Sequence, residues 1–125
     1  MAYSSFVQKV LQHIKDRYDV EPDYLWARSP NSAALRHHGT RKWFAALLMD
    51  TPRRVLGLPG EGTVDILDIK CDPRLLGSLV DGARYLPGYH MNKEHWLTVL
   101  LDGSVPLEEL SPLIEASYEL TKPYM

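Results

Sequence analysis

The chain has 125 residues, of which 45% are hydrophobic and 24% charged, and a formal net charge of −2. This length and composition predict one globular domain over residues 1–125 with a core of its own. They argue against a membrane-spanning segment, because no apolar run approaches the ~20 residues needed, and against an internal disulfide, because Cys71 is the one cysteine. The first residues lack the features of a signal peptide, so we expect a cytoplasmic protein with no membrane partner.

Positive charge is concentrated in the first half of the chain. Residues 1–54 contain nine Lys and Arg against five Asp and Glu, whereas residues 55–125 contain five against eleven. The excess is strongest over 28–54, where six basic residues stand against one acidic residue and two histidines are added. Such asymmetry indicates an anionic partner. The alternative is that these side chains solvate the exposed face of a sheet.

Apolar residues at helical spacing predict a first helix from about residue 3 to 18. Its apolar face consists of Phe6, Val7, Val10, Leu11 and Ile14. A connector with two prolines follows over 19–30. We expect its aromatic residues, Tyr24 and Trp26, to pack against the first helix.

Two short apolar segments, 32–38 and 43–49, are predicted to form a β-hairpin, because a Gly-Thr turn joins them and an Asp-Thr-Pro break follows. The second segment would also suit a buried helix, since periodicity does not separate the two. A glycine-rich loop is expected over 53–62. Residues 63–70 are predicted to form a third strand, with a bulge where the apolar residues change face.

The pair Asp72-Pro73 predicts the start of a second helix, with Asp as the N-cap and Pro at the first position. Gly82 fits the position just past the end of that helix. The residues expected on its buried face are Leu75, Leu76, Leu79 and Val80.

Further strands are expected at 83–86 and 96–101, and a last helix at 104–120, where Pro112 must lie in the first turn or cause a kink. The predicted order is therefore α-β-β-β-α-β-β-α. Most strand connections are too short for parallel crossovers, so the five-stranded sheet should be largely antiparallel. This predicts a two-layer domain of the α+β class.

The candidate metal ligands are His90, His95, His37, His38 and Cys71. A zinc site needs three or four converging ligands, and no Cys-x-x-Cys or His-Glu-x-x-His spacing is present. A hydrogen-bonded histidine pair that shapes a loop is the favoured interpretation of His90 and His95. We expect no metal and no cofactor.

Catalytic patterns are also weak. Cys71 precedes a predicted helix, whose N-terminus would lower the pKa of its thiol, but a small buried side chain is the favoured interpretation. The glycines of 57–62 are not followed by Gly-Lys-Ser, so they do not form a phosphate-binding loop. Asp65 and Asp68 lie three apart on a strand and should point to opposite faces. We expect no enzymatic activity.

Basic residues at two predicted loops form the candidate nucleic-acid contacts. They are Arg36, His37, His38, Arg41, Lys42, Arg53 and Arg54. The first five would lie at the tip of the hairpin, and the last two on the following loop. Lys93 would add a contact if its turn lies on the same side, whereas Asn92 has a second interpretation as the cap of a short turn.

The stretch from Tyr89 to Gly103 joins a polar loop to an apolar strand. With flanking residues and part of the last helix, it resembles the signature of the MmcQ/YjbR family. The matching residues are Pro87, Gly88, Tyr89, His90, Met91, Asn92, Lys93, His95, Trp96, Asp102, Gly103, Ser104, Ser117, Tyr118, Glu119 and Leu120. The resemblance extends from the first helix to Leu120. It implies a small bacterial protein, usually described as DNA-binding, with helices on one side of a five-stranded sheet.

Two functions follow as hypotheses. The leading one is binding of DNA through phosphate contacts from the basic loops, with little base specificity. The alternative is a protein-interaction adaptor or an oligomerising module that binds no nucleic acid. An apolar surface patch would favour the alternative, and a contiguous basic face would favour DNA.

Overall fold

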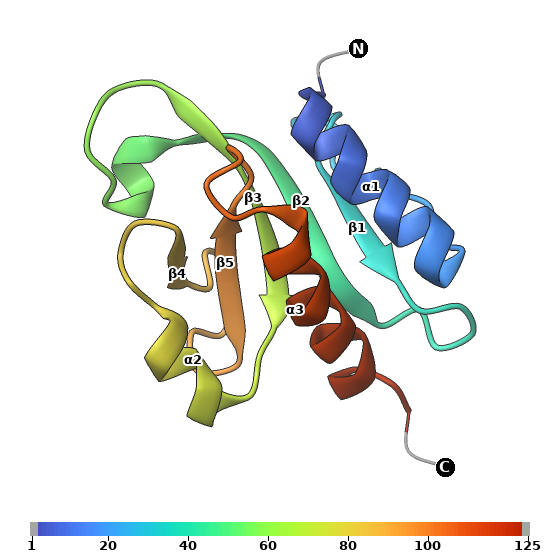
Figure 1. Ribbon diagram of the computed structural model, residues 1–125. Coiled ribbons are helices and arrows are strands. Elements are labelled where there is room, and N and C mark those ends of the chain that lie inside the picture. Colours follow the sequence, from blue (N-terminus) through green and yellow to red (C-terminus); the bar gives the residue numbers. More distant parts are fainter. Residues whose placement is uncertain (1–2, 124–125) are drawn as a thin grey trace.

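The computed structural model describes residues 3–123 as a five-stranded antiparallel sheet with helices (Figure 1). The strands lie in the order β1-β2-β3-β5-β4, and every neighbouring pair is antiparallel. The elements are α1 (Ser5–Tyr18), β1 (Ala33–Arg36), β2 (Trp43–Pro52), the 3-10 helix η1 (Arg53–Leu56), β3 (Thr63–Lys70), α2 (Pro73–Leu79), β4 (Tyr85–Pro87), β5 (Trp96–Leu100) and α3 (Leu107–Leu120). The predicted α+β class and element order are confirmed.

Helix α1 begins where the Ser4 hydroxyl accepts a hydrogen bond from the Val7 amide, and it ends at Asp19, whose φ is 56°. Its apolar stripe, which includes Val10 and Ile14, is buried against the sheet. The spacing of apolar residues therefore predicted both the helix and its buried face.

Helix α3 covers the same face of the sheet beside α1 (Figure 1). Its Ser117 hydroxyl donates to the Phe44 carbonyl oxygen (2.5 Å) and accepts from the Lys70 amide (2.8 Å). A single buried hydroxyl thus joins the ends of β2 and β3. The helix begins at Leu107, so Pro112 lies in its second turn and not its first.

The main core lies between these two helices and the sheet. Phe44 is fully buried, and its ring packs 5.6 Å from that of Tyr18 and 4.9 Å from that of Tyr118, centroid to centroid. We call this side of the sheet the covered face.

The opposite side, which we call the loop face, has a smaller apolar cluster. It consists of Leu58, Val64, Ile66, Leu86 and Leu100, with Leu48, Leu56 and Tyr89 packed against it. The cover over this cluster comes from the segments that contain η1 and the residues after β4. Loops and a short 3-10 helix, not α-helices, therefore shield the second face.

The bulge predicted in 63–70 is wrong. Strand β3 alternates regularly, with Val64 and Ile66 on the loop face and Leu67 on the covered face, and both faces are buried. The register shift lies instead in β2, between Leu48 and Thr51.

One predicted core position is also wrong. Leu75 on α2 is 46% exposed, although Asp72 caps that helix as predicted by accepting from the Arg74 amide. Trp96 is half-buried, with the Lys70 ammonium 5.4 Å from its ring centroid. The helix ends before Val80, so Gly82 belongs to the following turn. Among residues 3–123, no helix has the length and apolar character needed to cross a bilayer.

Candidate functional site

The loop between β4 and β5, residues 88–95, is held close to the sheet. A Cβ at Gly88 would lie 2.7 Å from the Cβ of Trp96, so only glycine allows this approach. The Asn92 side chain accepts a hydrogen bond from the Glu94 amide (2.8 Å). This confirms the interpretation of Asn92 as a turn cap. Local structure therefore accounts for two residues of the family signature, Gly88 and Asn92.

Asp68 on β3 is linked to this loop by hydrogen bonds. Its Oδ1 accepts from the Thr98 hydroxyl, and the Thr98 oxygen accepts from the Tyr89 amide (2.8 Å). Among the described residues 3–123, Oδ2 of Asp68 has no hydrogen-bond partner. Burial raises the pKa of this carboxyl to about 7, and the Thr98 bond and the charge of Lys93 oppose the rise. A carboxyl that titrates near neutral pH therefore supports the loop.

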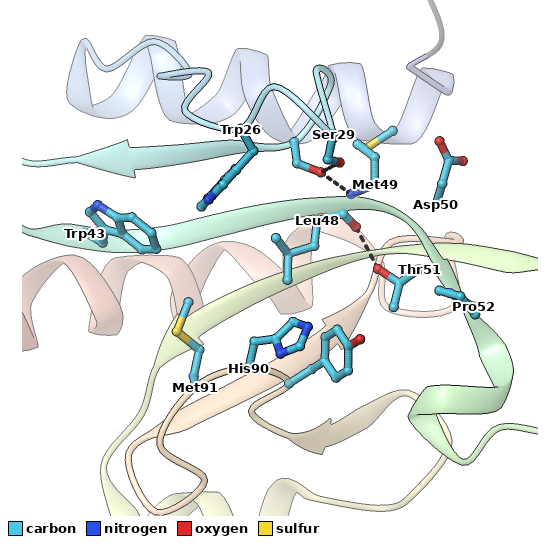
Figure 2. A pocket seen from close by; sticks show the side chains of 12 residues that line it. Trp26, Ser29, Trp43, Leu48, Met49, Asp50, Thr51, Pro52, His90 and Met91 are labelled. Atoms are coloured by element: carbon cyan, nitrogen blue, oxygen red, sulfur yellow. Dashed lines mark hydrogen bonds between the residues drawn. The ribbon is translucent and has the colours of Figure 1, made fainter.

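A cleft of about 470 Å³ lies between this loop and β2. Figure 2 shows Leu48 pointing from β2 toward His90 and Met91. The complete lining consists of Trp26, Ser29, Ser32, Trp43, Leu48, Met49, Asp50, Thr51, Pro52, Tyr89, His90 and Met91. This volume is within the usual range of ligand sites, roughly 300–1,000 Å³.

Aromatic rings form two walls of the cleft. The rings of Trp26 and Trp43 meet edge to face, with centroids 5.6 Å apart and planes at 89°. The rings of Tyr89 and His90 lie 4.0 Å apart at 43°. The prediction that Trp26 packs against the first helix is wrong, because its ring contacts Trp43. Tyr24 is 51% exposed, and its hydroxyl accepts a hydrogen bond from Tyr3.

The turn that carries Trp26 is fixed to β2 by two serines. The Met49 amide donates to the Ser32 hydroxyl oxygen (2.9 Å), and the hydroxyl oxygens of Ser29 and Ser32 lie 2.6 Å apart. Asp50 adopts a φ of 53° within the register shift of β2. The bulge and the two serines therefore set the shape of one side of the cleft before any ligand binds.

Two of the arginines predicted to contact phosphate share one carboxylate. Arg36 and Arg41 both pair with Asp23, the second at 3.1 Å. The Arg36 side chain is 22% exposed and that of Arg41 is 57% exposed. The charge of Arg36 is therefore largely compensated inside the protein, whereas Arg41 retains access to solvent.

His37 is not on the surface, and the prediction that it contacts nucleic acid is wrong. Its side chain is 4% exposed, its Nε2 lies 2.8 Å from the Thr121 hydroxyl, and its ring lies 4.2 Å from that of Tyr118. Burial lowers the pKa of this imidazole. His38 is exposed, with Nε2 2.7 Å from the carbonyl oxygen of Asp19.

The other cations predicted to contact nucleic acid differ in how many hydrogen bonds and ion pairs their side chains form. Arg53 and Lys93 each donate to a backbone carbonyl of their own loop, at 2.8 and 2.9 Å. Lys42 and Arg54 are exposed, and neither side chain forms an ion pair or hydrogen bond within residues 3–123. They lie at opposite ends of the ten-residue strand β2, roughly 30 Å apart at the usual rise per residue. The basic residues therefore form two separate groups.

No metal or thiol chemistry emerges from the geometry of the described residues. Over 3–123, no three His, Cys, Asp or Glu side chains are arranged to hold a metal ion. His90 and His95 are both exposed. Cys71 is buried, and burial together with the Asp72 charge raises the pKa of its thiol. This agrees with the interpretation of Cys71 as a small core side chain.

A family model described as YjbR matches residues 16–120. This chain belongs to the YjbR family. It is 43% identical over 115 residues to the uncharacterized protein YyaQ of Bacillus subtilis, a match that covers 92% of this chain and 97% of YyaQ. The uncharacterized protein YjbR of Escherichia coli is 52% identical over 33 residues, which cover 26% of this chain and 28% of that protein.

Two solved structures have the same fold. A crystal structure of a Pseudomonas syringae protein matches with a TM-score of 0.87 and 43% identity, covering 92% of this chain and 97% of that one. A Deinococcus radiodurans protein with a DUF419 domain matches with a TM-score of 0.68 and 24% identity, covering 95% and 81%. The second likeness shows the fold alone.

Sequence reasoning missed three residues that shape the site of this YjbR-family chain. Trp26 is predicted from the sequence to pack against the first helix and Trp43 to lie in a strand, and Asp68 is weighed only with Asp65 as a catalytic pair. The available signal was the bulky Trp43 at the start of an apolar strand, with a second tryptophan in a connector rich in proline. Only the register of the sheet pairs Asp68 with Thr98.

Proposed function

We propose that this chain binds DNA with little base specificity, through phosphate contacts from loops at the two ends of β2. The observation that carries the proposal is the position of Lys42 and Arg54. Both are exposed cations without an ion pair in the described residues, separated by the length of one strand. That length is comparable to one turn of DNA, about 34 Å.

The other predicted contacts have smaller roles in this proposal. Arg41 is exposed enough to add a contact, and its pairing with Asp23 weakens it. Arg53 and Lys93 shape their own loops. Because the net charge is −2, we expect weak binding at physiological salt, near the non-specific range of about 10⁻⁴–10⁻⁶ M.

The test is a salt-dependent titration of a short labelled duplex, followed by fluorescence anisotropy. The double variant Lys42→Ala with Arg54→Ala should weaken binding equally for all sequences. It should reduce the log–log salt slope by roughly 1.8, because each lost phosphate contact removes about 0.9.

The matched control is Lys9→Ala with Arg17→Ala, which removes the same charge from exposed positions on α1. The exposed pair of Arg17 with Glu115 contributes little to stability. No binding of wild-type protein at low salt would contradict the proposal, as would an equal loss of affinity in both double variants.

A second candidate is a protein-interaction module. The observation that favours it is the cleft on the loop face, where Leu48 and Met91 lie among aromatic rings. Flexible methionine side chains suit apolar partner surfaces. In that case both double variants should leave partner binding unchanged, because the cleft and not the cations would carry it.

A further inference from the structure

We infer that the cleft between β2 and the 88–95 loop receives an unstacked nucleobase of a single strand, held against the Trp26–Trp43 pair. This inference rests on the proposed function and names the part of the nucleic acid that its central site would take. Proteins that bind single strands combine cations along the backbone path with aromatic rings on which bases stack. The cleft has the aromatic rings, and two cations, Arg28 and Lys42, are close to its tryptophans in the sequence.

The aromatic walls suit a planar ligand. In the edge-to-face contact of Trp26 with Trp43, the ring that offers its edge keeps both of its faces free of the other ring. Both tryptophans are half-buried, so they are held in place and still reach the cleft. Tyr89 and His90 supply aromatic surface on the other wall. Flat rings of this kind bind the π-face of any base.

Two cations adjoin the tryptophans of the cleft in the sequence, whereas the one carboxylate of its lining, Asp50, is not next to them. Arg28 follows Trp26 by two residues and Lys42 precedes Trp43. Both cations are exposed, and neither has an ion pair within residues 3–123. The Asp50 carboxylate lies at the other end of the cleft (Figure 2). Phosphates would therefore lie near Arg28 and Lys42, with the base directed away from the phosphates, into the cleft and against the tryptophans.

The cleft is also built before a ligand arrives. Its two sides are fixed by the Met49–Ser32 and Tyr89–Thr98 hydrogen bonds. A preformed site lowers the entropic cost of ordering that opposes binding. Because bases inside a duplex are already stacked on one another, the cleft should prefer a single strand or a frayed end.

The experiment compares a short oligothymidylate with an abasic oligonucleotide of the same length and charge. The wild-type protein should bind the oligothymidylate about tenfold more tightly, because stacking adds affinity for each engaged base. Trp43→Leu should remove this difference, since leucine is apolar but not planar. Trp43→Phe should retain most of it. A parallel pair, Trp26→Leu and Trp26→Phe, repeats the test if Trp43→Leu does not fold.

The control is Trp96→Phe, which leaves Trp26 and Trp43 as the only tryptophans of the three in the chain. In this variant, oligothymidylate should still quench the indole fluorescence, and the abasic strand should not. Thermal unfolding followed by circular dichroism checks that each variant is folded.

Three results would overturn the inference. Equal affinity of the wild-type protein for the two strands would leave phosphate binding in place and remove the base from the cleft. Equal affinity of the Leu and Phe variants for oligothymidylate would show that the cleft binds the base by apolar packing and not by stacking. An apolar protein segment could then bind there equally well. No binding of either strand or of duplex would remove the proposed function as well.

Discussion

The covered face and the loop face of the sheet are sealed in different ways. On the covered face, α1 and α3 enclose fully buried side chains such as Phe44 and Ile114. On the loop face, two irregular segments cover a small cluster and leave the cleft with Leu48 half-buried. Helices that exclude water stabilise the fold, whereas loops on a rigid sheet are free to recognise a ligand.

Buried polar groups show the same contrast. On the covered face, Ser117, Thr121 and His37 all have hydrogen-bond partners. On the loop face, one oxygen of Asp68 has none within residues 3–123. Such exceptions are rare in folded proteins and often mark functional regions. The loop face therefore gives up some stability that the covered face retains.

The largest test of this contrast is Phe44→Ala. It should lower the free energy of unfolding by about 3–5 kcal/mol, because it empties a fully enclosed site in the main core. Leu48→Ala on the loop face should lower it by only about 1 kcal/mol, since that side chain is already partly exposed. Urea denaturation of both variants provides the measurement. Equal losses would mean that the two faces contribute alike to stability.

The variant Asp68→Asn tests the contrast between the buried polar groups of the two faces. The pKa of this carboxyl is about 7 in the fold and has the ordinary value of 3.8 in the unfolded chain, so the folded state binds the extra proton. The contribution of Asp68 to stability should therefore be complete below pH 4, decline as pH rises from 4 to 7, and stay constant above. The decline should amount to roughly 4 kcal/mol.

The measurement is the urea midpoint of the wild-type protein and of Asp68→Asn between pH 4 and pH 8. The variant should lack the decline, so the difference between the two profiles isolates Asp68 from the other carboxyl groups. Parallel profiles would show that Asp68 keeps its charge in the fold.

Gly88→Ala should have the most local effect on the structure. The new methyl group would lie 2.7 Å from the Trp96 Cβ and 2.9 Å from its carbonyl oxygen. Relief of this overlap moves the 88–95 loop and should cost about 1–3 kcal/mol. NMR spectra should show shifted signals around the cleft and unchanged signals in α1.

Gly77→Ala is the matched control, because a methyl group there meets no atom within 4 Å. It lies within α2, where alanine should add about 0.5–1 kcal/mol over glycine. If both glycine variants behaved alike, the close approach of Gly88 to β5 would have no energetic importance.

The sequence predicted the covered face better than the loop face, for physical reasons. The periodicity of residues 5–18 follows from one apolar side of a helix, and Asp72-Pro73 is a local start signal. Trp26 has no such periodicity around it, and its partner Trp43 lies across a connector and a strand. Its contact depends on how the turn docks onto the bulge in β2, which no local pattern encodes.

The prediction of the basic surface was wrong in part, because the positions of charged residues in the sequence do not show which of them form ion pairs. Arg36 and Arg41 looked like free cations until the isolated bridge between Asp23 and Ala34 brought Asp23 beside them. His37 looked basic and exposed, and it belongs instead to an aromatic cluster with Tyr118. Lys42 and Arg54 were the predicted cations that kept their side chains free of such contacts in residues 3–123.

The hydroxyl of Ser117 also limits when the chain can finish folding during translation. It joins Phe44 and Lys70, which were synthesised 73 and 47 residues earlier. Contacts between such distant residues form late, because the entropy of closing a long loop opposes them. The nascent chain therefore carries a partly uncovered apolar sheet until α3 has left the ribosome. That interval is when it is most exposed to aggregation and most dependent on chaperones.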